Sequence, residues 1–479
     1  MLPSSRMPKF VAFLLVVAAS LDDASAVDSK YSLETKYMKV PLDHFKWYAE
    51  EKSFNLRYLV DAKHHVQGGP IFVFTGDKGD INIYAQNTGF MFDIAPMFKA
   101  LLVFIEHRYY GQSLPFGNDT FSNPQNMIYL TTTQALADFA FVIDQLKREF
   151  FENVVQYDTY PIVAFGSSYG GMLAAWLRMK YPYTVLGAIS SSAPMFYFPG
   201  LSSCATFYEK VTKVFERYGR DQCIKTIKLG WDVIINLTKN KLGMDFVSSN
   251  WKLCSKISTT DDVEKLLEWL SDIYVNLALS NYHYPTDFYS PLPAYPVKVF
   301  CDKLTTSYFN DTKGLIEHFG YAIEMYTNYT GRTACNDINS KYHDITEFAF
   351  GYQMCTELIM PKCSTDADMF ITAPWDFDKF AKKCYKKYGT SSSRPDWGML
   401  IYGGKNLKYF SNIVFSNGEM DPYSCCGVSA NVTSSVMAFD IIDAPHHVDL
   451  RNADMSDNNY IQSARQFHIL ALRKWLKLE

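Results

Sequence analysis

The chain has 479 residues, and 48% of them are hydrophobic, which is enough to bury the cores of two domains. The formal net charge is −4 and no long run of basic residues is present, so the sequence predicts no nucleic-acid partner and no binding to an anionic membrane surface. It contains no cluster typical of a metal site and no phosphate-binding loop, so we expect no metal and no cofactor.

The first 26 residues are predicted to be a secretory signal peptide. Arg6 and Lys9 precede an apolar run at residues 10–19, and Ala-Ser-Ala at 24–26 is a typical cleavage site. The run is short for a bilayer span, and no other stretch qualifies as one. We therefore expect a soluble mature protein of the secretory pathway, either lysosomal or secreted. Ten cysteines and five glycosylation sequons agree with export: Asn118, Asn236, Asn310, Asn328 and Asn431.

Apolar strands alternate with amphipathic helices along much of the chain, which predicts a doubly wound, mostly parallel sheet of the α/β class. In the first part, strands are expected at residues 55–60, 71–75, 100–106, 161–165 and 185–190, with a helix at 133–150. Near the C-terminus, strands are expected at residues 412–415 and 436–442, followed by a helix within 459–476.

The sequence Gly-Ser-Ser-Tyr-Gly at residues 166–170 lies between a predicted strand and a helical pattern at 172–180. A G-x-S-x-G at such a junction is typical of the nucleophile elbow of an α/β-hydrolase, with Ser168 as the nucleophile. The glycines permit the sharp turn, and the helix N-terminus favours the negative charge that develops there. The alternative is that Ser168 is an ordinary helix N-cap.

Two later segments supply an acid and a base in the chain order that the hydrolase fold requires. Asp421 follows the strand at 412–415, and the pair His446 and His447 follows the strand at 436–442. Catalytic residues of open α/β sheets lie in loops at the carboxyl ends of strands, as these do. A neutral imidazole would take the proton of the serine hydroxyl, and a carboxylate would fix the tautomer of the imidazole.

The sequence leaves alternatives open for these two roles. Asp421 also fits a simple Asp-Pro turn. Asp443 and Asp449 compete with it as the acid, although both crowd the histidines in sequence. Only one of His446 and His447 can be the base. We favour Asp421 as the acid.

Backbone N–H groups are expected to stabilise the oxyanion that forms on the substrate. One should come from Tyr169, the residue after the nucleophile, and the other from the loop at residues 76–80, where we expect Gly79 to contribute. Losing one such donor typically costs about 3 kcal/mol of transition-state stabilisation.

The cysteines define an inserted domain. Eight of them lie between the strands predicted at 185–190 and 412–415, and an even number in a secretory chain predicts disulfides that spacing alone cannot pair. Helical patterns such as the one at 263–270 fill the same block. We therefore expect a disulfide-stapled helical cap at 195–408, inserted between two parts of an α/β-hydrolase domain at 27–194 and 409–479.

Several longer segments are far more specific than the elbow alone. They lie at residues 40–45, 106–111, 134–140, 166–182, 415–422 and 446–451. Through them, nearly the whole mature chain resembles the serine peptidase family that contains lysosomal Pro-X carboxypeptidase and dipeptidyl peptidase II. Further segments look like the Pro-X carboxypeptidase branch of that family, at residues 274–278, 291–296, 355–357 and 402–406.

The resemblance implies cleavage of the bond after proline, with release of one C-terminal residue from peptide substrates. It assigns the nucleophile to Ser168, the acid to Asp421 and the base to His446. It also implies that Arg451 lies beside the triad, and the alternative is a surface counter-ion to Asp449. A homodimer is expected from the family. Four disulfides are implied: Cys204–Cys363, Cys223–Cys301, Cys254–Cys335 and Cys355–Cys384.

Selectivity for proline needs a compact apolar pocket, because the ring offers no amide N–H to recognise. The resemblance puts Met172, Met360 and Tyr423 at the pocket walls, although each also fits plain core. The sequence departs from the family just after Asp421. Where relatives have tryptophan and a glycine run, residues 423–427 read Tyr-Ser-Cys-Cys-Gly, and the adjacent cysteines are compatible with a vicinal disulfide, buried thiols or pairing elsewhere.

A second departure is Lys78, where relatives usually carry glutamate. A basic residue there should hinder capture of a substrate's free amine, which disfavours dipeptidyl-peptidase activity. A carboxypeptidase must also bind the terminal carboxylate of its substrate with cationic or N–H donors, and the sequence does not identify that group.

The leading hypothesis is therefore a serine exopeptidase that cleaves after proline. Its rivals are a dipeptidyl peptidase that releases N-terminal X-Pro dipeptides, an esterase or lipase, and a catalytically inactive binding protein with a hydrolase fold. An esterase would lack the family segments, and the intact serine, acid and histidine disfavour an inactive protein. Activity in an acidic compartment would require His446 to stay partly neutral below its ordinary pKa of about 6.5.

Overall fold

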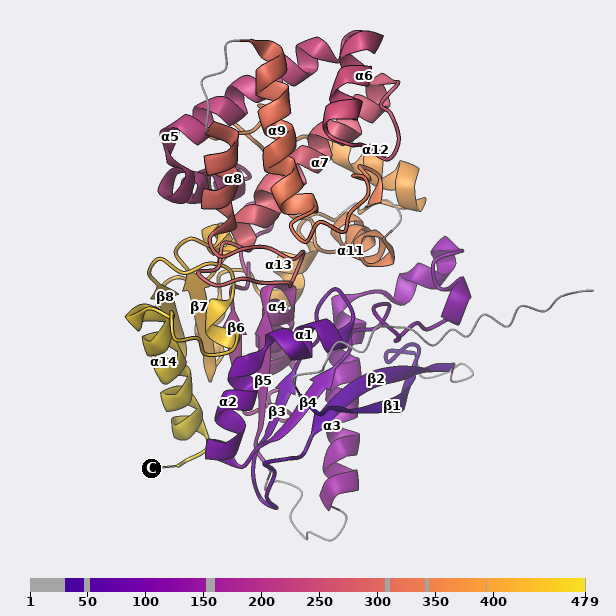
Figure 1. Ribbon diagram of the computed structural model, residues 1–479. Coiled ribbons are helices and arrows are strands. Elements are labelled where there is room, and N and C mark those ends of the chain that lie inside the picture. Colours follow the sequence, from indigo (N-terminus) through magenta and orange to yellow (C-terminus); the bar gives the residue numbers. More distant parts are fainter. Residues whose placement is uncertain are drawn as a thin grey trace, which may run out of the picture. The chain divides into compact units, whose positions relative to one another are not determined.

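Figure 1 shows the computed structural model of the protein, which describes residues 31–46, 52–151, 160–305, 311–340, 344–392 and 394–478. The predicted signal peptide at 1–26 and the sequon at Asn310 lie outside these residues. Residues Leu33–Glu479 form one unit, to which all the helices and strands below belong.

An eight-stranded sheet forms the centre of the fold, in the order β1-β2-β4-β3-β5-β6-β7-β8. β2 pairs antiparallel with both β1 and β4, and all other neighbours pair parallel. β3 to β7 are buried along their whole length, as expected of parallel strands covered on both faces. The strands are β1 (Glu34–Pro41), β2 (Ser53–Asp61), β3 (Ile71–Phe74), β4 (Leu101–Ile105), β5 (Ile162–Ser167), β6 (Gly187–Ser191), β7 (Ile413–Gly418) and β8 (Val436–Ile441).

Helices cover both faces of this sheet. α3 and α4 pack against one face and α1, α2 and α14 against the other, so that side chains alternate between two apolar clusters along each central strand. This is the predicted α/β-hydrolase fold, with the elbow directly after β5 (Figure 1). The helices are α1 (Ile81–Asn87), α2 (Gly89–Phe98), α3 (Thr132–Phe151), α4 (Ser168–Lys180) and α14 (Asn459–Trp475).

A mainly helical segment is inserted between β6 and β7 and builds the predicted cap (Figure 1, magenta to orange). Its helices enclose an apolar cluster of their own, which meets the cluster of the sheet at Met360. The long helix α5 changes direction at Arg220, where the backbone has a φ of +66°. The helices are α5 (Thr206–Leu237), α6 (Lys241–Asn250), α7 (Thr260–Leu279), α8 (Pro296–Thr305), α9 (Thr312–Thr327), α11 (Ile345–Thr356), α12 (Phe377–Tyr388) and α13 (Trp397–Tyr402).

Short 3-10 helices shape several of the connecting loops. Two of them, η4 and η5, lie in the loops after β7 and β8, which hold the predicted acid and base. Their bounds are η1 (Gly117–Asp119), η2 (Pro124–Tyr129), η3 (Leu407–Tyr409), η4 (Pro422–Cys426) and η5 (Val448–Leu450). Among the helices of the described ranges, none combines the length and apolar character needed to cross a bilayer.

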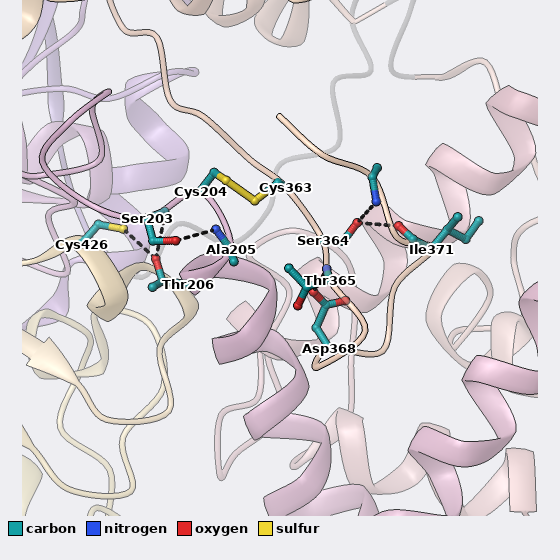
Figure 2. The surroundings of a disulfide bond; sticks show 11 residues. Ser203, Cys204, Ala205, Thr206, Cys363, Ser364, Thr365, Asp368, Ile371 and Cys426 are labelled. Atoms are coloured by element: carbon teal, nitrogen blue, oxygen red, sulfur yellow. Dashed lines mark hydrogen bonds between the residues drawn. A yellow bond between two sulfur atoms is a disulfide. The ribbon is translucent and has the colours of Figure 1, made fainter. Parts of the chain in front are cut away.

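Four disulfides link parts of the cap, and they are the pairs that the family resemblance implies: Cys204–Cys363, Cys223–Cys301, Cys254–Cys335 and Cys355–Cys384. Figure 2 shows the first of these, which connects the residues leading into α5 with the loop after α11. For Cys425 and Cys426 the sequence left open a vicinal disulfide, buried thiols or pairing elsewhere. In the structure both are free thiols. The buried Cys426 Sγ lies 3.8 Å from Thr206 Oγ1 (Figure 2).

Candidate active site

Ser168 is the first residue of α4 and stands at the junction with β5. Its φ of +56° lies in the left-handed region, which is strained for a residue with a side chain and typical of a nucleophile elbow. The flanking glycines are needed for packing. A Cβ on Gly166 would lie 2.1 Å from the carbonyl oxygen of Gly170, and one on Gly170 would lie 2.4 Å from that of Gly76. The G-x-S-x-G pattern thus follows from a turn that leaves no room for a Cβ at either glycine.

The predicted acid and base are in direct contact. His446 Nδ1 donates a hydrogen bond to Asp421 Oδ2 at 2.9 Å, and both side chains are completely buried. Asp421 Oδ1 accepts from the backbone N–H of Tyr423 at 2.9 Å, which fixes the orientation of the carboxylate. The opposite nitrogen, His446 Nε2, is buried and has no hydrogen-bond partner within the described part of the chain. With its proton on Nδ1, the imidazole carries a lone pair on Nε2 that can accept a proton.

Sheet pairing brings these groups to the same edge as Ser168. Ser167 of β5 pairs with Ser191 of β6, and Ser191 pairs with Ser416 of β7. The next residue after β6, Ser192, accepts a hydrogen bond through Oγ from the N–H of His447 at 2.8 Å. The loops after β5, β7 and β8 therefore meet at the carboxyl ends of adjacent parallel strands, where catalytic groups of this fold class gather.

The competing acids are engaged elsewhere. Asp443 is partly exposed and accepts from the hydroxyl of Tyr218 at 2.9 Å. Asp449 is buried and accepts hydrogen bonds from His468 Nε2, Ser191 Oγ and Ser416 Oγ, each at 2.7 Å. Burial alone would raise the pKa of Asp449, but these hydrogen bonds hold it well below its ordinary value. Asp449 therefore stays ionised. It belongs to the loop after β8 that also carries His446 and His447, which we call the histidine loop, and its hydrogen bonds fasten this loop to Ser191 of β6 and Ser416 of β7.

His447 does not resemble a general base. Burial, together with the charges of His446 and Arg451, holds the pKa of His447 well below its ordinary value. Its backbone adopts a φ of +41°, and its ring lies 4.5 Å from that of His446 between centroids. We interpret His447 as a neutral neighbour that shapes the turn and leaves His446 as the base.

The loop at residues 76–80 is fastened to the elbow by a residue that the sequence did not single out. Asp77 accepts hydrogen bonds from the backbone N–H of Gly170 at 3.1 Å and from that of Lys78. The N–H groups of Tyr169 and Gly79, the predicted oxyanion donors, are assigned no acceptor among the described residues. Both N–H groups are thus unpaired within the described residues, and their oxyanion role stays a prediction.

The family described as Serine carboxypeptidase S28 matches residues 40–468. The chain belongs to this family. Lysosomal Pro-X carboxypeptidase of Bos taurus is 39% identical to it and aligns over 99% of this chain and 93% of that protein. The protein of the same name from Mus musculus is 40% identical, with 96% and 92% aligned, and prolyl carboxy peptidase like protein 5 of Caenorhabditis elegans is 36% identical, with 94% and 91% aligned. The solved structure of VinJ matches 93% of this chain and 99% of its own at 12% identity, with a TM-score of 0.35, which is too low to assign the fold by itself.

The S28 membership confirms the resemblance carried by the sequence motifs and makes the protein a serine-type peptidase. In this S28 peptidase, the side chain of Tyr169 joins a buried hydrogen-bond network behind the nucleophile. Gln353 Nε2 donates to the hydroxyl of Tyr169 at 2.9 Å and to Glu357 Oε1 at 3.1 Å. His107 Nε2 lies 3.0 Å from the same hydroxyl, while its Nδ1 donates to the carbonyl of Arg108.

The protonation of this network can be assigned from its geometry. Burial lowers the pKa of His107 to about 4, so the ring is neutral and its Nε2 accepts from the Tyr169 hydroxyl. Gln353 and Glu357 belong to the cap, so the network ties the cap to the residue that follows the nucleophile. His107 and Glu357 lie in the family segments at 106–111 and 355–357, but the sequence gave neither residue a role, because the contacts of the network join residues far apart in the chain.

We expect the stability of the S28 peptidase to depend on pH through Glu357. Burial raises the pKa of Glu357 to about 7, although Gln353 and Thr132 donate hydrogen bonds to it. Because the pKa of Glu357 is higher in the folded protein than in the unfolded chain, its contribution to the free energy of unfolding is fully present below the unfolded pKa of about 4.5. That contribution is lost as pH rises through the folded pKa of about 7. The variant Glu357→Gln resembles the protonated acid. Over this range, the free energy of unfolding of wild type should fall on the order of 3 kcal/mol relative to that of the variant.

Thermal or urea unfolding of both proteins between pH 4.5 and 7.5 measures this difference. Glu209→Gln, which removes a charge from an exposed residue of α5, serves as the control and should follow the wild-type curve. Parallel stability curves for wild type and Glu357→Gln would mean that Glu357 does not titrate in this range.

The predicted pocket residues have different surroundings. Met172 is completely buried in the main apolar cluster, which favours its plain-core interpretation. Met360 and Tyr423 are partly exposed and pack at the cap cluster, and the ring of Tyr423 lies 5.3 Å from that of His446 between centroids. Tyr423 is therefore the predicted pocket residue with a demonstrated contact to the triad.

Arg451 is not a surface counter-ion to Asp449, the alternative considered from the sequence. It is 7% exposed, its Nε donates to the hydroxyl of Tyr284 at 3.0 Å, and its guanidinium lies 4.4 Å from the centroid of the Tyr282 ring. Tyr282 in turn donates to the carbonyl of His446 at 3.1 Å. Arg451 thus reaches the histidine loop through an aromatic segment of the cap.

The described sequons lie where attached glycans would reach solvent. Asn118, Asn236 and Asn431 are exposed, and Asn328 is partly exposed at the end of α9. Their accessibility is compatible with the predicted glycosylation of a secretory protein.

Proposed function

We propose that this protein is a Pro-X carboxypeptidase, a serine exopeptidase that cleaves after proline and releases the C-terminal residue. The observation that carries the proposal is the buried contact between His446 and Asp421, with the second imidazole nitrogen unpartnered at the sheet edge that bears Ser168. The near full-length similarity to proteins named lysosomal Pro-X carboxypeptidase supports this substrate class.

The residues support an acyl-enzyme mechanism. Ser168 Oγ attacks the carbonyl carbon of the proline residue while His446 Nε2 takes the hydroxyl proton. Asp421 holds the imidazole in the tautomer with Nδ1 protonated and stabilises the imidazolium. The N–H groups of Tyr169 and Gly79 donate to the oxyanion. His446 then protonates the leaving amine, and a water molecule activated by the same histidine hydrolyses the ester.

Proline selectivity is proposed to come from the partly exposed apolar surface of Met360 and Tyr423, with Met172 beneath it. A proline ring offers shape and no N–H, so apolar contact is the recognition available to it. The tyrosine hydroxyl stays neutral, since burial raises the pKa of Tyr423 above its ordinary value.

The proposed location is the secretory pathway, either the lysosome or the exterior. The predicted leader, the four disulfides and the exposed sequons support it, as do relatives named lysosomal. The domain limits at 195 and 408 and the homodimer stay predictions.

Two peptides test the proposed function. One is blocked at its N-terminus and ends in Pro-Phe, and the other has a free N-terminus beginning X-Pro. Mass spectrometry of the products across about pH 4 to 7.5 should show release of C-terminal phenylalanine, a range that spans the ordinary histidine pKa. Release of an N-terminal dipeptide instead would assign the protein to the dipeptidyl-peptidase branch, and cleavage of neither would favour an inactive or differently selective protein.

A further inference from the structure

Lys78 is a cation held next to the nucleophile elbow. Its backbone N–H donates to Asp77, and the other carboxylate oxygen of Asp77 accepts from Gly170, two residues after Ser168. The loop that carries Lys78 also carries the predicted oxyanion donor Gly79. The backbone position of Lys78 is thus fixed relative to the reacting centre by two hydrogen bonds to one carboxylate.

The ammonium of Lys78 lies between this loop and helix α11 of the cap. Its Nζ is 5.3 Å from the centroid of the Phe350 ring, and the side chain is 18% exposed. The nearest carboxylate oxygen recorded for it, Asp77 Oδ1, is 3.5 Å away, which is longer than an ordinary N–H···O hydrogen bond. An ammonium has three N–H donors, and Asp77 is the carboxylate paired with Lys78 among the described residues, so donors remain for a ligand.

Lys78 remains charged despite its burial. Burial alone would lower the pKa of Lys78, but the carboxylates of Asp77 and Glu347 raise it above its ordinary value. The group is therefore cationic throughout the pH range in which a histidine base functions.

Lys78 is connected to the nucleophile elbow through its ion-pair partner Asp77, which bonds the first turn of α4. Two arginines also lie near the histidine loop. Arg465 donates to the carbonyls of Val448 and Asp449. Arg451 donates to Tyr284 and Thr286 of the cap, while its buried Nη1 has no hydrogen-bond partner among the described residues. Lys78 is thus a cation on the predicted oxyanion loop, tied to the nucleophile elbow through Asp77, and its ammonium keeps donors without a partner among the described residues.

We propose that the ammonium of Lys78 binds the terminal carboxylate of the substrate and so selects peptides by their free C-terminus. The proposal rests on the carboxypeptidase function proposed above. In a substrate of that class the carboxylate lies one residue beyond the cleaved bond, close to the reacting carbonyl. A partly buried ammonium gives a charge-assisted hydrogen bond to this carboxylate and repels a free amino terminus.

The test compares two N-blocked peptides that both end in Pro-Phe, one as the free acid and one as the C-terminal amide. The readout is the ratio of kcat/KM for the acid to that for the amide. Wild type should prefer the acid, and Lys78→Met should lower the ratio by about 10- to 100-fold, the range expected for a hydrogen bond between charged groups. Lys78→Arg should restore much of the preference because it keeps the charge.

Lys225→Met serves as the matched control, since Lys225 is an exposed lysine of α5, and it should keep the wild-type ratio. Thermal unfolding checks that each variant is folded, and Lys78→Gln replaces the methionine variant if that one is not. A wild-type ratio near one, or an unchanged ratio in folded Lys78→Met, would overturn the role of Lys78 while leaving the carboxypeptidase function intact. Failure of wild type to release phenylalanine from the acid peptide would instead overturn the function itself.

Discussion

Replacing Ser168 with alanine is expected to lower kcat by about 10⁶-fold while leaving the fold unchanged. In the proposed mechanism this side chain supplies the attacking oxygen, and His446 Nε2, which has no hydrogen-bond partner among the described residues, takes its proton. Alanine fits the position sterically because serine already carries a Cβ at this φ of +56°. Turnover of the N-blocked Pro-Phe peptide, with thermal unfolding as a check on folding, measures the effect.

Ser167→Ala is the matched control for this variant. Ser167 is the neighbouring serine in the same turn and precedes α4 as its N-cap, but its hydroxyl makes no capping hydrogen bond. Its removal should therefore leave most of the activity. If Ser168→Ala retained as much activity as Ser167→Ala, Ser168 would not be the nucleophile.

Much of the fold could be predicted because its central strands are buried on both faces. β3 to β7 are largely apolar runs that follow turn residues, and the sequence located each of them within a few positions. β1 was not predicted because it is an edge strand with charged residues such as Glu34 and Lys36, and most of its length is exposed or half-buried. α2 was not predicted either, since Pro96 lies inside the helix and the segment lacks a polar face.

The residues of the candidate site could likewise be predicted only in part. The triad candidates could be predicted because each follows a strand, and strand ends are visible in the sequence. Asp77 and Gln353 could not, because their partners Gly170 and Tyr169 lie 93 and 184 positions away in the chain. Such contacts depend on how the cap and the β3–α1 loop pack against α4, and no local pattern encodes them. Pairing of the cysteines also depends on tertiary contacts, and it could be anticipated only through the family resemblance.

Replacing Asp421 with asparagine is expected to lower kcat by about 10⁴-fold through the tautomer of His446. The structure indicates how the amide would be oriented. Asp421 Oδ1 accepts from the N–H of Tyr423, so the amide oxygen would keep that bond and the NH₂ would face His446 Nδ1. Nδ1 would then have to accept, which moves the imidazole proton to Nε2 and removes the lone pair that takes the proton of Ser168. Kinetics on the N-blocked Pro-Phe peptide across pH measure the loss.

Two further variants test whether the acid has been assigned to the right residue. Asp443→Asn removes a partly exposed carboxylate bonded to Tyr218 and should leave kcat close to wild type. Asp449→Asn disturbs hydrogen bonds from His468, Ser191 and Ser416 beneath the histidine loop, so its main effect should be a lower melting temperature. Because Asp449 bonds His468 and not His446, a tautomer defect is expected only in Asp421→Asn. If Asp443→Asn or Asp449→Asn lost kcat as severely as predicted for Asp421→Asn while remaining folded, the acid would have to be reassigned.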